Sequence, residues 1–416
     1  MSENSHDVAV VGGGVIGAAC AHFLNKLDYN VTVFDRSDFG SQCSHGNCGK
    51  ICPSHALPLA APGVIAQIAR SLFGGNTPFF VTPQISPVFW YWFLQFLGEC
   101  RHNRMITNGR SAYALLARSR ELYEDLIGEC SLDCEWERKG NLYVFQREKS
   151  FTQNRKKFEI LKKDFGLEIE SISGSELRSI EPTLKEGLAG GYYSSSDANL
   201  RPDRLLASWW SNLVQRGVRV IERTEILGLR FHQRRAVALR SRQEEYEFHN
   251  FVFATGVWTP KLGKDLGCTP PIQPAKGYSL TMERPKSCPK IPMDFVDHGT
   301  AVTPMLSGLR LGSILEFSGF DQRLKRERLQ LLYRSAGEYL SELPSTKVEE
   351  EWCHWRSMTP NGLPRIGRCP SAPNVFVAAG HNMLGMSMAP ATGELIAELL
   401  DGRLTFVDPS PYSLRQ

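Results

Sequence analysis

A glycine-rich segment near the start of the chain has the residue types and spacing needed to hold a dinucleotide. Gly12, Gly14 and Gly17 give the pattern G-x-G-x-x-G directly after an apolar run at residues 8–11. The first glycine allows a tight turn, the second lets backbone N–H groups approach a pyrophosphate, and the third lets helix and strand pack closely. Asp35 follows 18 residues after Gly17 and is placed to accept hydrogen bonds from an adenosine ribose. The segment therefore predicts a strand, a helix and a second strand around a dinucleotide.

Two later segments predict further parts of the same site. An apolar strand runs into Gly256, where the chain can turn beneath a diphosphate. Near the C-terminus the sequence predicts a buried strand at Asn374–Ala379, a turn at Gly380–Gly385 and a helix at Ala389–Leu400. Pro390 near the first turn and Gly402 just past the end are typical helix boundary signals. A second helix N-terminus, so far along the chain, suggests a cofactor longer than one nucleotide, such as a flavin that becomes anionic on reduction.

Composition favours an ordinary globular enzyme. The 416 residues are 42% hydrophobic and 22% charged, with a net charge of +4 and no basic arm or helix that would indicate nucleic-acid binding. The chain has 11 cysteines, an odd number, and no secretory peptide, so we expect reduced thiols in a cytoplasmic protein. No apolar run reaches the roughly 18 residues that a membrane span needs.

The loop after Asp35 carries three cysteines. Cys43, Cys48 and Cys52, with His45 among them, leave a metal site as an alternative, but the spacing lacks a C-x2-C pair and a second cluster. Buried or flavin-proximal thiols are the preferred interpretation, and no metal is expected.

The remaining elements frame an inserted part of the chain. Residues 99–185 are predicted to be mainly helical, with a strand pair around 136–145, and a charged helix is expected at 322–343. The segment VFWYWFLQFL, 88–97, is too short to cross a bilayer. It is either a buried helix at a domain junction or an interfacial patch that contacts lipid headgroups.

These motifs together resemble the FAD-dependent D-amino acid oxidase superfamily over essentially the whole chain. The small-subunit type of D-amino acid dehydrogenase is the most similar group, because PAKGYS at 274–279, RSMTPNGLPRIG at 356–367 and GHNMLGMSMAPATG at 380–393 are similar to its motifs. The resemblance implies an α/β fold, with a Rossmann-like FAD-binding domain and an inserted antiparallel-sheet substrate domain. We expect the FAD-binding domain at 1–88, 196–268 and 350–416, and the substrate domain at 89–195 and 269–349.

The resemblance also implies site residues. Arg356 matches the arginine that grips the substrate carboxylate, and a guanidinium suits bidentate carboxylate recognition. Tyr278 matches a position on the strand that faces the substrate, and His381 lies in the turn that faces the flavin, where a polar or positive group tunes N1. The residues expected to hold FAD are Gly12, Gly13, Gly14, Val15, Ile16, Gly17, Asp35, Arg36, Ser44, Asn47, Gly49, Gly256, Gly380, Leu384 and Gly385.

The implied reaction is the oxidative deamination of a D-amino acid. Hydride passes from the α-carbon to flavin N5, and water hydrolyses the imino acid to a 2-oxo acid and ammonia. A D-proline or hydroxy-D-proline dehydrogenase and a glycine/sarcosine-type oxidase remain alternatives, because Cys48, Lys50 and the residues of the terminal turn depart from the family pattern. A non-catalytic flavin-binding subunit is the alternative of another class. The electron acceptor (quinone, oxygen or a partner protein) stays open, as does peripheral contact with the inner face of a membrane.

Overall fold

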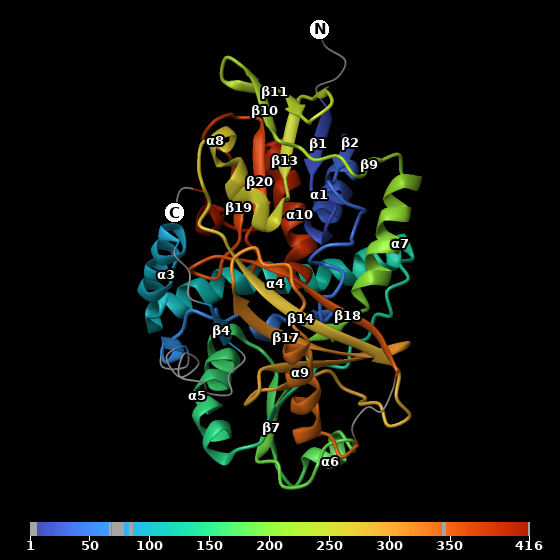
Figure 1. Cartoon of the computed structure of the whole chain (residues 1–416), viewed down its shortest axis with the longest axis vertical. Helices are drawn as coiled ribbons and strands as arrows, with labels where there is room; N and C mark the ends of the chain where they lie inside the picture. Colours follow the sequence, from blue (N-terminus) through green and yellow to red (C-terminus); the bar gives the residue numbers. More distant parts are fainter. Residues whose placement is uncertain (1–5, 66–67, 69–78, 83–85, 343–346, 415–416) are drawn as a thin grey trace.

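The computed structural model describes residues 6–65, 68, 79–82, 86–342 and 347–414. Figure 1 shows two sheets, one above the other, with the N-terminal strand and the C-terminal helix in the upper part. None of the helices within these ranges is long and apolar enough to cross a membrane.

The upper sheet has six strands from three separate parts of the chain. Its order is β19 (Arg365–Arg368), β20 (Val375–Ala379), β13 (Asn250–Phe253), β1 (Asp7–Val11), β2 (Asn30–Phe34) and β9 (Arg219–Ile221). All neighbouring pairs are parallel except β19 with β20, at one edge. Its strands are apolar runs because both faces are covered, as is usual in parallel sheets. The predicted strand, helix and strand around the first glycines are confirmed.

Helices bury one face of this sheet. α1 (Val15–Asn25) packs against α10 (Gly385–Asp401), and α10 packs in turn on α4 (His102–Cys130). A Cβ at Gly393 of α10 would lie 2.5 Å from the backbone of Ala19 of α1, so the backbones of these two helices are in close contact. α7 (Pro202–Gln215) also contacts α1.

The lower sheet has nine strands and is mainly antiparallel. Its order is β18 (Val348–Met358), β14 (Gln273–Glu283), β17 (Gly308–Phe317), β16 (Thr300–Met305), β15 (Met293–Phe295), β5 (Asn141–Phe145), β7 (Gly190–Ser194) and β6 (Ile169–Ser173), with β4 (Phe79–Val81) beside β17. α9 (Arg326–Tyr339) packs on β14 and β17, and α5 (Glu148–Phe165) on β5, β6 and β7. Residues 350–358, assigned above to the FAD-binding part, are paired in this sheet.

The smaller elements connect the two sheets or extend them. They are the strands β3 (Lys50–Ile51), β8 (Ala198–Asn199), β10 (Gly228–His232), β11 (Arg235–Arg240) and β12 (Glu245–Glu247), the helices α3 (Pro87–Glu99), α6 (Leu177–Ile180) and α8 (Gly263–Leu266), and the 3₁₀ turns η1 (Pro53–His55), η2 (Gly256–Leu262) and η3 (Ser410–Tyr412).

Two local predictions are wrong. The strand pair around 136–145 does not form: β5 pairs instead with the distant strands β7 and β15, because its apolar residues face neighbours from other parts of the chain. The terminal helix begins at Gly385 rather than 389, so Pro390 lies inside it and not in its first turn. Gly402 ends that helix in the left-handed conformation (φ 71°), as predicted.

The contact of α1 with β1 predicts how two glycines differ in their tolerance of a methyl group. A Cβ at Gly17 would lie 1.8 Å from the carbonyl oxygen of Gly12, whereas one at the exposed helical Gly128 would meet nothing within 4 Å. Gly17→Ala should lower the free energy of unfolding by about 1–3 kcal/mol or more, because the backbone must shift. Gly128→Ala should raise it by about 0.5–1 kcal/mol. Thermal or urea unfolding of both variants checks this, and equal effects would contradict the packing described.

Candidate functional site

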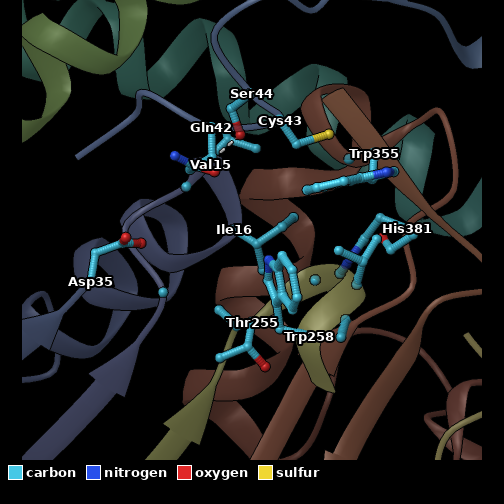
Figure 2. A pocket seen from close by; sticks show the side chains of 18 of the residues that line it. Val15, Ile16, Asp35, Gln42, Cys43, Ser44, Thr255, Trp258, Trp355 and His381 are labelled. Carbon is cyan, nitrogen blue, oxygen red and sulfur yellow. Dashed lines mark hydrogen bonds between the residues drawn. The ribbon is translucent and has the colours of Figure 1, made fainter. Parts of the chain in front are cut away.

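A deep groove lies where the carboxyl ends of the upper strands meet the edge of the lower sheet. Its cavity volume is about 330 Å³, within the range of about 300–1,000 Å³ that is usual for small-molecule sites. Figure 2 shows Asp35 at one end and Trp355 and His381 at the other, with Ile16 and Trp258 between them. The groove is therefore elongated and lined from both sheets.

The glycine loop forms one wall of the groove. Gly12 has φ 118°, and a Cβ there would lie 2.4 Å from the carbonyl oxygen of Ala254 at the end of β13. Gly14 is the N-cap of α1 and has no side chain to cap it, so the first-turn N–H groups of this helix, apart from that of Val15, have no side-chain partner. The Asp35 carboxylate accepts hydrogen bonds from the N–H groups of Gly13 (2.6 Å) and Ser37 (2.8 Å), which holds the loop against β2.

The segment 42–50 lies across the polar face of the lower sheet. Ser44 Oγ accepts a hydrogen bond from the N–H of Val15 at 3.1 Å, which joins the segment to the start of α1. At the other side, Gln42 Oε1 lies 2.7 Å from His354 Nε2 and His45 Nε2 lies 2.7 Å from Glu350 Oε1, both partners being on β18. The segment therefore connects the glycine loop to the strand that carries Arg356.

Arg310 is the central contact of this segment with the sheet. Its side chain is 1% exposed and donates to the carbonyl oxygens of His45 (3.0 Å) and Asn47 (2.7 Å), and to Thr281 Oγ1 (2.9 Å). Asp203 and Glu350 lie 3.6 and 3.7 Å from its guanidinium. A buried guanidinium needs such partners, since an unsatisfied charge costs several kcal/mol.

Arg356 of β18 is a half-buried cation that lines the groove. Its Nη1 and Nη2 donate to the carbonyl oxygens of Ile314 (2.6 Å) and Ser313 (3.1 Å). These use two of the five guanidinium N–H groups, so three remain for another acceptor. Burial lowers the pKa of Arg356, and no carboxylate of the described residues forms an ion pair with it. Such a group attracts an anion.

The turn at 380–385 places His381 beside the groove as a neutral group. Burial lowers the pKa of His381 to about 3. Thr392 Oγ1 donates its one hydrogen to the carbonyl oxygen of Met388. It can therefore only accept from His381 Nε2, which lies 3.0 Å away and is the donor. Of the two kinds of group expected in this turn, polar or positive, His381 is thus a neutral polar group. Asn382, at φ 54°, is bonded to Thr359 and Gly380 and joins the turn to the end of β18.

Formal charge is unevenly distributed along the groove. Asp35 and Glu225 are its only carboxylates among the described lining residues, and Arg36 and Lys261 flank Trp258 at 3.9 and 4.3 Å from the ring centre. The lining residues from 42–46, β18 and the terminal turn carry no carboxylate, and burial lowers the pKa of His354 to about 4. At neutral pH, Arg356 is thus the one formal charge among these described residues.

Tyr278, which was expected to face the substrate, and Lys50, which departs from the family pattern, do not line the groove. Tyr278 is fully buried in the lower sheet, donates to Glu316 Oε2 at 2.7 Å and does not line the groove, so the structure does not support a substrate-facing position. Its side chain belongs instead to a core network with Lys325. Lys50 is also buried and pairs with Asp294 at 2.9 Å.

Most of the residues predicted to hold the cofactor line the groove: Gly12, Gly14, Val15, Ile16, Asp35, Arg36, Ser44, Asn47, Gly256 and Gly385. The others support it from behind: Gly13 packs on Phe39, Gly17 on Gly12, Gly49 on Leu200 and Gly380 on Thr359, while Leu384 is the N-cap of α10. Several residues of β18, η2 and the segment after β9 line the groove but were not predicted as site residues: Trp352, His354, Trp355, Trp258, Lys261, Thr224 and Glu225. Only the aromatic spacing WCHW at 352–355 gave a signal for any of them.

The donors along the groove fit FAD. Two helices, α1 and α10, begin at the groove, and the side chain of neither N-cap residue caps its helix. Ser44 takes the N–H of Val15, and the other N–H groups of the first turns and the positive dipole ends remain for a ligand. The start of α1 suits a diphosphate, and the glycines leave room for the backbone to approach it. Among the residues described, no group of three or more His, Cys, Asp and Glu side chains is arranged to hold a metal ion.

Comparison with known proteins gives consistent matches over the whole length. A family model described as FAD dependent oxidoreductase (DAO) matches residues 7–399. The chain is 28% identical to the D-amino acid dehydrogenase of Granulibacter bethesdensis over 98% of both chains, and 30% identical to that of Azorhizobium caulinodans over 95% of this chain and 96% of the relative. Its fold is similar to glycine oxidase from Geobacillus kaustophilus (TM-score 0.79, 23% identity, 99% of each chain) and to L-proline dehydrogenase from P. horikoshii (TM-score 0.75, 19% identity, 99% of this chain and 100% of that one).

The buried, neutral His381 predicts a specific pH dependence of stability. Its pKa is about 3 in the folded protein and about 6.5 in an unfolded chain, so below pH 6.5 the unfolded state binds one more proton. Stability is lost as the pH falls, by about 1.4 kcal/mol per pH unit between pH 6 and 4. His381→Gln keeps an N–H donor for Thr392 and removes this loss. In urea unfolding at pH 6, 5 and 4, the free energy of unfolding should fall less with pH in the variant than in the wild type. An equal fall in both proteins would show that His381 is not buried in its neutral form.

Proposed function

The chain belongs to the DAO family of FAD dependent oxidoreductases, and we propose that it catalyses the oxidative deamination of a D-amino acid with a neutral side chain. The observation that carries the proposal is Arg356: a half-buried guanidinium in the groove, with three N–H groups still available and no acidic partner among the described residues. The preference for D-amino acids rests on the relatives named D-amino acid dehydrogenase.

The residues at the Arg356 end determine how the substrate binds. Its carboxylate pairs with Arg356, because a planar guanidinium holds two oxygens in a fixed orientation. The substrate amine finds no described carboxylate there, so it binds best in its neutral form. FAD, when bound, supplies the ring that accepts hydride from the α-carbon, and water then converts the imino acid into a 2-oxo acid and ammonia.

The same electrostatics restrict the substrate side chain. One guanidinium neutralises one carboxylate, so a second carboxylate has no cation to pair with, and a cationic side chain has no acid. The nearby aromatic lining from Trp352 and Trp355 suits apolar groups instead. Alanine-like and larger apolar side chains are therefore favoured over lysine or glutamate.

Removal of the guanidinium tests the proposal. Arg356→Ala should lower kcat/KM for the best D-amino acid by about 10²-fold, which corresponds to about 3 kcal/mol, because charge-assisted hydrogen bonds to the carboxylate are lost. The exposed Arg334 on α9 offers a matched control, and Arg334→Ala should leave kcat/KM unchanged. FAD content of each variant is measured from the flavin absorbance. An Arg356→Ala enzyme that keeps its FAD and full activity would refute the assigned role.

We also propose that α3 rests on a membrane surface of anionic lipid. The helix buries Phe89, Trp92 and Phe96 and is fixed by a hydrogen bond from Trp92 Nε1 to the carbonyl oxygen of Met358 (3.1 Å), two residues after Arg356. Its other face is exposed: Val88 by 65%, Trp90 by 51%, Tyr91 by 65% and Leu94 by 65%.

The exposed face of α3 has side chains that suit the headgroup region of a membrane. Trp, Tyr and Leu side chains on one helix face are typical of interfacial helices, and the exposed Arg101 and Arg104 follow directly at the start of α4. A helix hydrogen-bonded to the last residue of β18, two residues from Arg356, favours a membrane-soluble electron acceptor such as a quinone.

Vesicle sedimentation tests this surface. The wild type should sediment with phosphatidylglycerol-containing vesicles and less with phosphatidylcholine alone, and Tyr91→Glu with Leu94→Glu should weaken binding at least about tenfold, because two charges must enter the interface. Leu404, which is 96% exposed beyond α10, supplies the control variant Leu404→Glu. No sedimentation of the wild type, or equal loss in the control, would reject α3 as the contact.

A further inference from the structure

The Arg356 guanidinium lies on a cradle made of backbone atoms from two neighbouring strands. Gly277 of β14 lies directly beneath it: a Cβ at this position would be 2.5 Å from Cζ and 2.7 and 2.8 Å from the two Nη atoms. Only a residue without a side chain leaves that space. The guanidinium therefore rests on the peptide backbone of β14 rather than on a side chain that changes rotamer.

A β-bulge in β17 supplies the other half of the cradle. Lys276 pairs with Glu316 and Tyr278 with Ser313, so two residues of β17 face the single residue Gly277. Ile314 is the first of these two residues and Ser313 directly precedes it; the carbonyl oxygens of both accept the hydrogen bonds from Arg356. Bulges beside active sites commonly re-aim the groups around them.

The bulge holds an unfavourable backbone conformation. Ser313 has φ 116° and Ile314 has φ 48°, and neither is a glycine. A positive φ is a genuine outlier for a β-branched residue such as Ile314, and each strained residue costs on the order of 1–3 kcal/mol. This conformation aims two successive carbonyl groups at one guanidinium. The strained residues are therefore those that hold Arg356, the residue that binds the substrate in the proposed function.

We propose that Gly277 and the Ser313–Ile314 bulge are positioning residues that fix the orientation of Arg356 before a carboxylate arrives. The directions of its three remaining N–H groups are then fixed before binding, and little side-chain freedom is lost when the carboxylate binds. Preorganisation of this kind raises affinity by lowering the ordering cost. The inference rests on the proposed function for Arg356 as the carboxylate site, but not on the identity of the amino acid.

A double-mutant cycle on the FAD-loaded enzyme tests the cradle. Benzoate serves as the carboxylate probe, with its Kd measured by calorimetry, so the test works even if no amino acid is oxidised. Gly277→Ala should raise the Kd at least about tenfold, or about 1.4 kcal/mol, because the methyl group displaces the guanidinium. In an Arg356→Ala background the same change should have no further effect. An equal rise in both backgrounds would show that Gly277 acts through general packing, and would overturn the proposal.

Ser313→Gly provides a second variant that is expected to fold. Glycine adopts the positive φ without strain, so the unfolding temperature should not fall, while the carbonyl groups lose their fixed direction. We expect the Kd for benzoate to rise about threefold to tenfold, and the rise to vanish in the Arg356→Ala background. Unchanged benzoate binding in Ser313→Gly and in Gly277→Ala would contradict the cradle. If benzoate binds the wild type no better than Arg356→Ala, then the proposed role of Arg356 itself fails.

Discussion

The site depends on the seating of segment 42–50 across the polar face of the lower sheet, with Arg310 at its centre. A guanidinium that is 1% exposed must satisfy its hydrogen bonds within the protein, and it does so with two carbonyl oxygens of this segment. The segment also holds Ser44 against the start of α1, while Lys50 pairs with Asp294 at its far end. Arg310 therefore sets how far the glycine loop lies from the strand that carries Arg356.

This arrangement separates two kinds of electrostatic environment in one groove. Near Asp35 the lining offers helix N–H groups and charges of both signs, which suits a diphosphate and a ribose. Near Arg356 the histidines are neutral and carboxylates are absent from the described lining. The chain thus provides one positive group for one carboxylate, in surroundings that favour a neutral amine, and needs no protein base beside it.

The sequence predicted the parts that local chemistry determines. The glycine pattern with Asp35 identified the first wall of the groove because a turn and a helix start require those residues in order. Tyr278 could not be placed, because a strand pattern does not say which face meets a cavity, and its partner Glu316 is 38 residues away. The role of Arg310 could not be predicted either, because the carbonyl groups that it binds lie 263 and 265 residues away in the sequence. The bulge at Ser313 likewise follows from pairing between strands.

The most direct test of the account is anaerobic mixing of the FAD-loaded enzyme with single amino acids, followed by the flavin absorbance near 450 nm. D-alanine and larger neutral D-amino acids should reduce the flavin, with one 2-oxo acid and one ammonia formed for each flavin reduced, whereas L-alanine, D-lysine and D-glutamate should reduce it little. A flavin that no amino acid reduces would contradict the proposed oxidation of amino acids by this protein. Faster reduction by D-lysine than by D-alanine would contradict the charge argument at Arg356.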